Sequence, residues 1–323
     1  MISILRSNQP IAWSIVPGTI FLGIIWHIWQ SQASALSLAV YGIGLLLVAG
    51  YSHHLYVQRN FVERGDAALA WSFVAWSVAL IPVASPIEGI QTWCSLLLIC
   101  AALDFTLRMH RQPSTSNIQF RAGLAAGLAV SIQPLNVGLL LGLIAVQMRS
   151  RPLIMREWVM LTFGVTHGVL LAEVGWSFIA IDDLVGASAE NIGEGIVALR
   201  DSWSAIAMGA AGLFGLFMFI REDSRLVLKT KNTRYNTFIT LALLAATGGA
   251  FCWMAPMNFR GVNSLEHAIS HWSVIAALTL GFLSVSLVPK RDRRSDKLGT
   301  LDAMAWIVFV GTLLVVFGLS SIQ

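Results

Sequence analysis

Charged residues are scarce in this chain. Only 12% of its 323 residues are Asp, Glu, Lys or Arg, whereas 56% are hydrophobic. An average soluble domain carries about 25% charged residues. A soluble globular protein is therefore excluded, and the composition indicates an integral membrane protein.

Other absences narrow the function classes. The three cysteines, Cys94, Cys100 and Cys252, all lie inside hydrophobic stretches, which excludes a disulfide framework and cysteine zinc spacing. No glycine-rich phosphate loop is present, so nucleotide-driven chemistry is not expected. No cofactor is predicted. The net charge of +4 comes from basic loops that we expect to face anionic lipid headgroups, so no nucleic-acid partner is predicted.

What the chain has instead is a series of eleven hydrophobic stretches. Because hydrocarbon offers no hydrogen-bond partners to the backbone, segments of this kind are stable in a membrane only as helices. We therefore expect an all-α, polytopic transmembrane helix bundle that forms one integral membrane domain over residues 1–323. The stretches are residues 10–29, 35–52, 67–86, 91–107, 122–133, 135–148, 158–180, 203–220, 236–255, 267–288 and 301–319.

The basic residues orient this bundle. Of the 21 Lys and Arg, all but Arg200 and Arg260 fall in alternate gaps between the stretches. Lys and Arg favour cytoplasmic loops, so the N-terminus is predicted inside and the C-terminus outside, in a bacterial inner membrane. The longest outer loop, residues 181–202, is acidic. Residues 1–35 also resemble a signal peptide, but the apolar core is of full spanning length, which favours a retained helix.

One pair of stretches is too short for two full crossings. Only 27 residues separate Arg121 from Arg149, and a single crossing would reverse the charge pattern of every later loop. The sequence therefore predicts a helical hairpin over residues 122–148 that turns at 131–136, where Pro134 disfavours helix at the preceding residue. Two thin-membrane crossings are the alternative. Gln133 and Asn136 at the tip are candidate lipid- or phosphate-binding residues beside an outward cavity.

Ionisable residues near the membrane are the remaining site candidates. Glu173 lies within the stretch 158–180, where a carboxylate is costly without a partner, and is a candidate catalytic residue. Asp104 and Arg108 have the spacing of a local ion pair. Arg260 and Arg200 are outer cations whose forked guanidinium suits a lipid phosphate. His267 and His271 are spaced to chelate one metal, but no third ligand accompanies them on that helix, so no metal site is predicted.

Two stretches of sequence resemble known families. The chain resembles an uncharacterised Bacteroidota-type family of multi-pass inner-membrane proteins in its opening and in a later run. The opening is Met1-Ile2-Ser3-Ile4-Leu5-Arg6-Ser7-Asn8-Gln9-Pro10, and the later run extends from Ala102-Leu103-Asp104 through Arg108 to Arg121-Ala122-Gly123-Leu124-Ala125-Ala126-Gly127 and Gln133-Pro134. More distantly, the short helix that ends at Pro134 is similar to a segment of the C-superfamily glycosyltransferases. These enzymes take sugars from polyprenyl-phosphate carriers at the outer leaflet.

The second resemblance implies a general base in the first outer loop. That loop, residues 30–34, contains no acid here. Asp182 and Asp183 of the acidic outer loop would then serve as base or metal ligands, with Arg260 on the donor phosphate. A non-enzymatic subunit or scaffold of an envelope complex, with membrane-protein partners, is the alternative function. A small-molecule or lipid transporter is a second alternative, although only one broken hairpin is visible.

Overall fold

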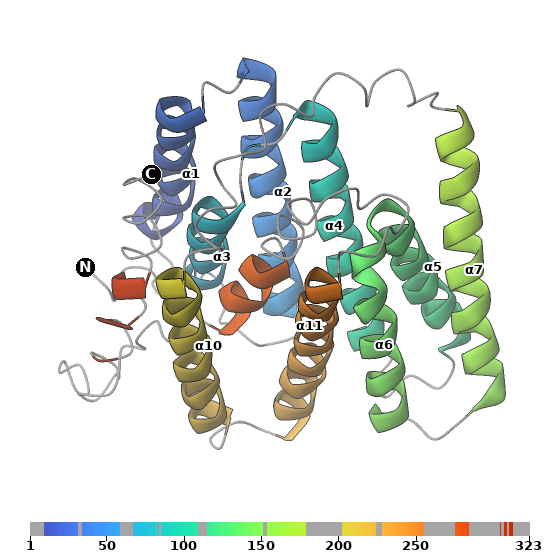
Figure 1. Cartoon of the computed structure of the whole chain (residues 1–323). Helices are drawn as coiled ribbons and strands as arrows, with labels where there is room; N and C mark the ends of the chain where they lie inside the picture. Colours follow the sequence, from blue (N-terminus) through green and yellow to red (C-terminus); the bar gives the residue numbers. More distant parts are fainter. Residues whose placement is uncertain are drawn as a thin grey trace. The chain divides into compact units, whose positions relative to one another are not determined.

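The computed structural model describes residues 10–31, 34–58, 67–81, 83, 85–108, 115–150, 154–178, 202–223, 228–254, 275–283, 304, 307–308 and 310–312. Every regular element within these residues is a helix (Figure 1). The elements are α1 (Pro10–Ser31), α2 (Ala35–Gln58), α3 (Ala68–Leu80), α4 (Pro86–Arg108), α5 (Ser116–Ile132), the 3-10 helix η2 (Pro134–Asn136), α6 (Val137–Ser150), α7 (Met155–Phe178), α10 (Ser202–Asp223) and α11 (Leu228–Met254).

The all-α prediction is confirmed for the described residues. Each predicted stretch up to 236–255 corresponds to a helix, and 267–288 contains the helical residues 275–283. By length and composition, three described helices are able to cross a membrane: Ala35–Gln58, Pro86–Arg108 and Met155–Gly175. The number of crossings and their orientation stay predictions.

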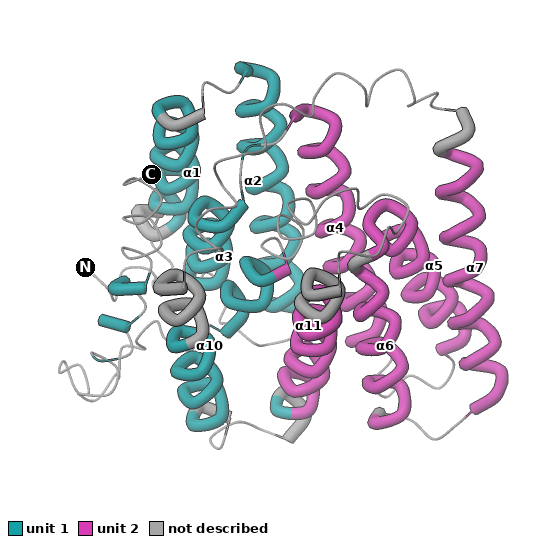
Figure 2. The backbone as a smooth tube through the Cα atoms, viewed as in Figure 1, with its two compact units in different colours: residues 1–83, 193–231, 276–323 teal, residues 84–192, 232–275 magenta. Residues whose placement is uncertain are grey.

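The chain contains two compact units, each assembled from segments far apart in the sequence (Figure 2). Unit 1 comprises Met1–Val83, Gly193–Lys231 and Ala276–Gln323. Unit 2 comprises Ala84–Ile192 and Asn232–Ile275. Unit 1 is organised around α3, and unit 2 around the pair α5 and α7.

The helix α3 is shorter than the predicted stretch 67–86, because it ends at Leu80. Its C-cap, Ile81, is extended with ψ 112°, the conformation favoured in a residue that precedes proline. The helix is buried on nearly all sides, with Trp76 fully enclosed. The Ser72 hydroxyl donates to the carbonyl of Gly281 at 3.0 Å, so the later segment 275–283 packs directly against α3.

The helix α4 begins earlier than the predicted residue 91. Ser85 caps it, because the Glu88 backbone N–H donates to the Ser85 hydroxyl at 3.4 Å and the Gly89 N–H donates to the Ser85 carbonyl at 2.8 Å. Pro86 occupies the first helical position, where its missing N–H has no intrahelical partner in any case. The break between α3 and α4 is therefore set by local turn chemistry rather than by hydropathy.

In unit 2, α5 and α7 run in parallel at very close range. A Cβ atom added to Gly164 would lie 2.2 Å from the Phe120 carbonyl oxygen, and one added to Gly127 would lie 2.3 Å from the Val165 carbonyl oxygen. Gly123 and Gly168 make equivalent approaches. Each helix therefore offers a pair of glycines four residues apart, the arrangement that brings transmembrane backbones together.

Two short helices are present over the predicted hairpin, and the break between them lies where the sequence placed it; that both ends of the hairpin lie on one side of a membrane stays a prediction. The helix α5 ends at Ile132, Gln133 is extended, and η2 leads into α6. At about 1.5 Å per residue, the 17 residues of α5 and the 14 of α6 are both too short for a hydrocarbon layer of about 30 Å. The glycines of α6 pack away from α5: a Cβ on Gly142 would lie 2.9 Å from the Thr240 Cα of α11.

Candidate functional site

The tip of the hairpin is a buried polar cluster. Asn136 is 1% exposed, and its side-chain amide donates to the Ser95 hydroxyl of α4 at 2.7 Å and to the Ala129 carbonyl at 3.0 Å. These bonds tie the break to both α4 and α5. Asn136 was predicted to bind lipid or phosphate, and its amide N–H groups are occupied by these protein acceptors.

Gln133 lies at the same break but is bonded differently. Its side chain is 5% exposed, and its side-chain Nε2 has no acceptor among the described residues. Its backbone N–H continues the helix by donating to Ala129, and its carbonyl accepts from the Asn136 N–H at 2.9 Å. The Gln133 amide is therefore a buried donor with unused capacity, which is costly unless an acceptor reaches it.

A second buried polar cluster joins the N-terminal ends of α5 and α7. Glu157, 5% exposed, accepts hydrogen bonds from the Thr115 hydroxyl and from the Gln119 side-chain amide, the latter at 3.1 Å. Glu157 lies in the first turn of α7, where the helix dipole favours a carboxylate. This cluster was not predicted from the sequence. An acid in the first turn of a helix was the available signal, but its two partners lie about 40 residues earlier in the chain.

The predicted ion pair on α4 is confirmed. Asp104 is 4% exposed and accepts from the Arg108 guanidinium, one turn later on the same helix. Arg108 also lies over the Phe105 ring, at 5.7 Å from its centroid. The pair neutralises the Asp104 carboxylate within α4, as the four-residue spacing predicted.

Glu173 lies on the exposed side of α7, opposite the side that packs against α5. Nine residues separate it from Gly164, which is about 180° around the helix, and its side chain is exposed. Leu170 and Val174, which flank it around the helix, are each more than half exposed. His167 instead packs against Phe163, with ring centroids 4.2 Å apart, so the two ionisable groups of α7 have different surroundings.

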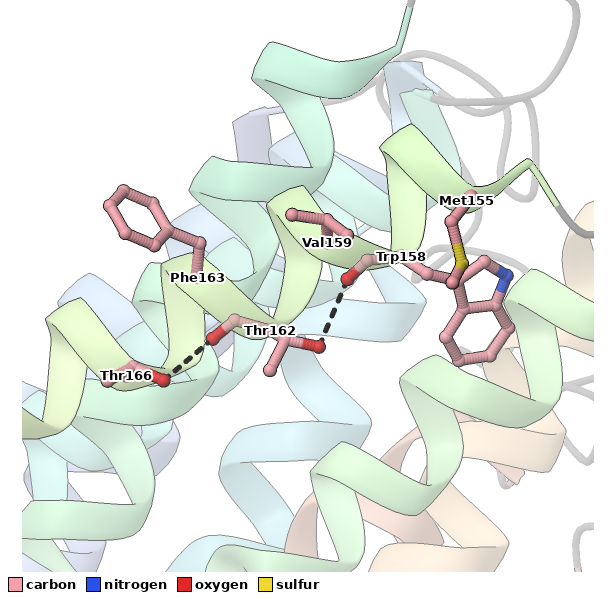
Figure 3. Close-up of a pocket in the computed structure, with 6 residues that line it drawn as sticks. All are labelled: Met155, Trp158, Val159, Thr162, Phe163 and Thr166. Carbon is pink, nitrogen blue, oxygen red and sulfur yellow. Dashed lines mark hydrogen bonds between the residues drawn. The ribbon is translucent and has the colours of Figure 1, made fainter.

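A shallow groove of about 420 Å³ runs along the same exposed side of α7, nearer the start of the helix (Figure 3). Met155 and Trp158 lie at one end of it, and Phe163 and Thr166 at the other. Its two hydroxyls are internally bonded, because Thr162 donates to the Trp158 carbonyl and Thr166 to the Thr162 carbonyl, both at 3.0 Å. The groove is therefore apolar toward any occupant. Its lining residues are Met155, Trp158, Val159, Thr162, Phe163 and Thr166.

The other predicted site residues lie outside the described residues. These are the candidate base or metal ligands, the outer cations and the two histidines: Asp182, Asp183, Arg200, Arg260, His267 and His271. Within the part of the chain that the structure describes, no group of three or more His, Cys, Asp or Glu residues is placed to hold a metal ion.

Comparisons with known proteins do not place the chain in a family. No family model, no curated protein and no solved structure matches it.

Proposed function

We propose that this protein is a multi-pass protein of the bacterial inner membrane that acts as a non-enzymatic subunit. In this proposal the outer part of α7, around Glu173, binds a transmembrane segment of a partner protein. The proposal rests on one observation: the Glu173 carboxylate is exposed, and the apolar side chains that flank it on α7 are exposed as well.

The position of Glu173 along α7 supports this proposal. Arg156, at the start of the helix, belongs to the predicted cytoplasmic end. Glu173 follows 17 residues later, about 25 Å along the axis, which lies within a hydrocarbon layer of about 30 Å. A carboxylate facing lipid at that depth costs a few kcal/mol, so such residues generally face protein or water. A partner helix that offers a Lys, Arg, hydroxyl or amide would remove the cost.

The opposite side of α7 explains why the helix can serve two neighbours. Gly164 and Gly168 on that side pack against the backbone of α5. This packing fixes the rotation of α7 and turns Glu173 away from unit 2. Leu170 and Val174 flank the carboxylate and would form the apolar border of the contact. Such a border excludes lipid and water around a central polar contact.

Site-specific photo-crosslinking in native membranes tests the proposal. A benzophenone amino acid replaces Leu170 or Val174, with Leu213 of α10, 72% exposed, as the matched position elsewhere. The expected result is one discrete protein adduct from 170 and 174, absent at 213 and lost when Glu173→Ala is added. The crosslinked peptide must lie in a transmembrane segment with a polar or basic residue, from a protein that co-purifies stoichiometrically. Adducts only with lipid, or with residues of this same chain, would reject a partner at Glu173.

A second candidate function is the glycosyltransferase-like handling of polyprenyl-linked sugars at the outer leaflet. The observation that favours it is the buried Gln133 amide at the hairpin break, which has no acceptor among the described residues. A phosphate or sugar oxygen at the tip would supply one. In this reading Asp182 and Asp183 act on the acceptor and Arg260 holds the donor phosphate. If Asp182→Asn, Asp183→Asn and Arg260→Ala all leave the lipid-linked sugar profile of the cell unchanged, this reading is wrong.

A further inference from the structure

The groove near the start of α7 has the length and lining of a lipid chain site. Its lining runs from Met155 to Thr166, which is about 16 Å along the helix axis. That is about half of a hydrocarbon layer of about 30 Å, the depth of one leaflet. Because the Thr162 and Thr166 hydroxyls are bonded to their own helix, the wall offers hydrocarbon and aromatic surface to an occupant.

Positive charge lies beside the Met155 end of this groove. Arg156 follows Met155 directly and is exposed, and Arg149 is exposed in the last turn of α6. Arg149 lies in the last turn of α6 and Arg156 in the first turn of α7, and the end of α6 and the start of α7 lie on the same side of unit 2 (Figure 1). Neither forms an ion pair with an acid among the described residues. Arg149 is held against Tyr235 of α11, with its guanidinium 5.4 Å from the ring centroid.

Glu157, the acid next to Arg156 in the chain, does not cancel this charge. Glu157 lies about 100° around α7 from Arg156, on the side that packs against α5, where it accepts from Thr115 and Gln119. An anionic headgroup would match this uncancelled positive charge.

We propose that the groove binds one anionic glycerophospholipid of the leaflet at the Arg156 end of α7. The lipid phosphate lies at Arg156, and one acyl chain follows Val159, Phe163 and Thr166. Basic residues at the cytoplasmic ends of transmembrane helices attract anionic headgroups. The site uses the first half of α7, whereas the proposed partner contact uses Glu173 in the second half, so either proposal can fail while the other holds.

Native mass spectrometry of the full-length protein in detergent tests the site. The probes are phosphatidylglycerol and phosphatidylcholine with identical acyl chains, titrated separately. The expected result is a single bound phosphatidylglycerol, with several-fold weaker binding of phosphatidylcholine. Arg156→Gln removes a charge-assisted contact, so it is expected to weaken phosphatidylglycerol binding about tenfold, toward the phosphatidylcholine level. Arg121→Gln, which changes an exposed cation of α5, serves as the matched control and is expected to bind as the wild type does.

A second pair of variants tests the groove rather than the charge. Thr162→Phe fills it and is expected to weaken binding of both lipids. Leu171→Phe adds bulk about 180° away on the same helix and is expected to leave binding unchanged. Equal binding of the two lipids by the wild type, equal loss in Arg156→Gln and Arg121→Gln, or unchanged binding in Thr162→Phe would each overturn the proposal. Helicity and elution volume confirm that each variant is folded before titration.

Discussion

Gly164 of α7 packs directly on the backbone of Phe120 in α5, so that a Cβ atom added to Gly164 would lie 2.2 Å from the Phe120 carbonyl oxygen. Flexible side chains can move out of such a contact, but a backbone carbonyl inside a helix cannot. The two helices must therefore separate before any side chain fits. This contact fixes the rotation of α7 about its axis. It therefore determines which side of α7 is exposed at both proposed sites.

We expect Gly164→Ala to lower the free energy of unfolding by about 1–3 kcal/mol, the typical cost of overpacking. Gly175→Ala on the same helix is the control, because a Cβ there would meet nothing within 4 Å. Its better helix propensity is expected to leave stability unchanged or to raise it by up to about 1 kcal/mol. Unfolding in mixed micelles with increasing dodecyl sulfate, followed by helicity, measures both. Equal effects at the two glycines would contradict the close approach.

Ser95 and Asn136 are expected to be energetically coupled across the hairpin. Their hydrogen bond of 2.7 Å is buried between α4 and η2. A double-mutant cycle with Ser95→Ala and Asn136→Ala is expected to give a coupling energy of about 0.5–1.5 kcal/mol, the range for interhelical bonds in membranes. Ser52→Ala is the control hydroxyl, because Ser52 bonds only its own helix at Ala49. Its effect is expected to add to that of Asn136→Ala without coupling.

Glu157→Gln is expected to destabilise the protein by about 1–3 kcal/mol. The carboxylate accepts from Thr115 with one oxygen and from Gln119 with the other, whereas a glutamine side chain places an NH2 donor opposite one of these two donors. Glu88→Gln tests the contribution of the helix dipole alone, because Glu88 is likewise an acid in the first turn of a helix. That change is expected to cost less than about 1 kcal/mol. Similar losses for the two variants in the same unfolding assay would assign the effect to the dipole instead.

The elements that sequence predicted well are those fixed by local chemistry. The hairpin break follows from Pro134 and from the spacing of Arg121 and Arg149, and the structure places the turn at Gln133. The pair of Asp104 and Arg108 lies within one helix turn, so it requires no knowledge of tertiary packing. The end of α3 was also encoded locally, before Pro82, but the hydrophobic run continues past it and conceals the break in a hydropathy reading.

The clusters that sequence did not reveal depend on which helices meet. Glu157 finds Thr115 and Gln119 only because α5 and α7 run in parallel with their first turns level. The packing of the hairpin glycines Gly123, Gly127, Gly138 and Gly142 likewise depends on which helices meet. They contact α7 and α11, because backbone atoms of α7 and threonine residues of α11 lie level with them. No periodicity within a single helix specifies such a pairing.

The predicted orientation of the hairpin is directly testable by cysteine accessibility. In a variant with Cys94, Cys100 and Cys252 replaced by alanine, single cysteines are placed at Asn117 and Arg149, exposed positions near the start of α5 and the end of α6. Because the basic residues at both ends favour the cytoplasm, both positions are expected to react with a membrane-impermeant maleimide only in inside-out vesicles. Labelling from opposite sides would mean that α5, η2 and α6 together make one crossing. The polarity of every later loop would then reverse, and with it the leaflet of the proposed lipid site at Arg156.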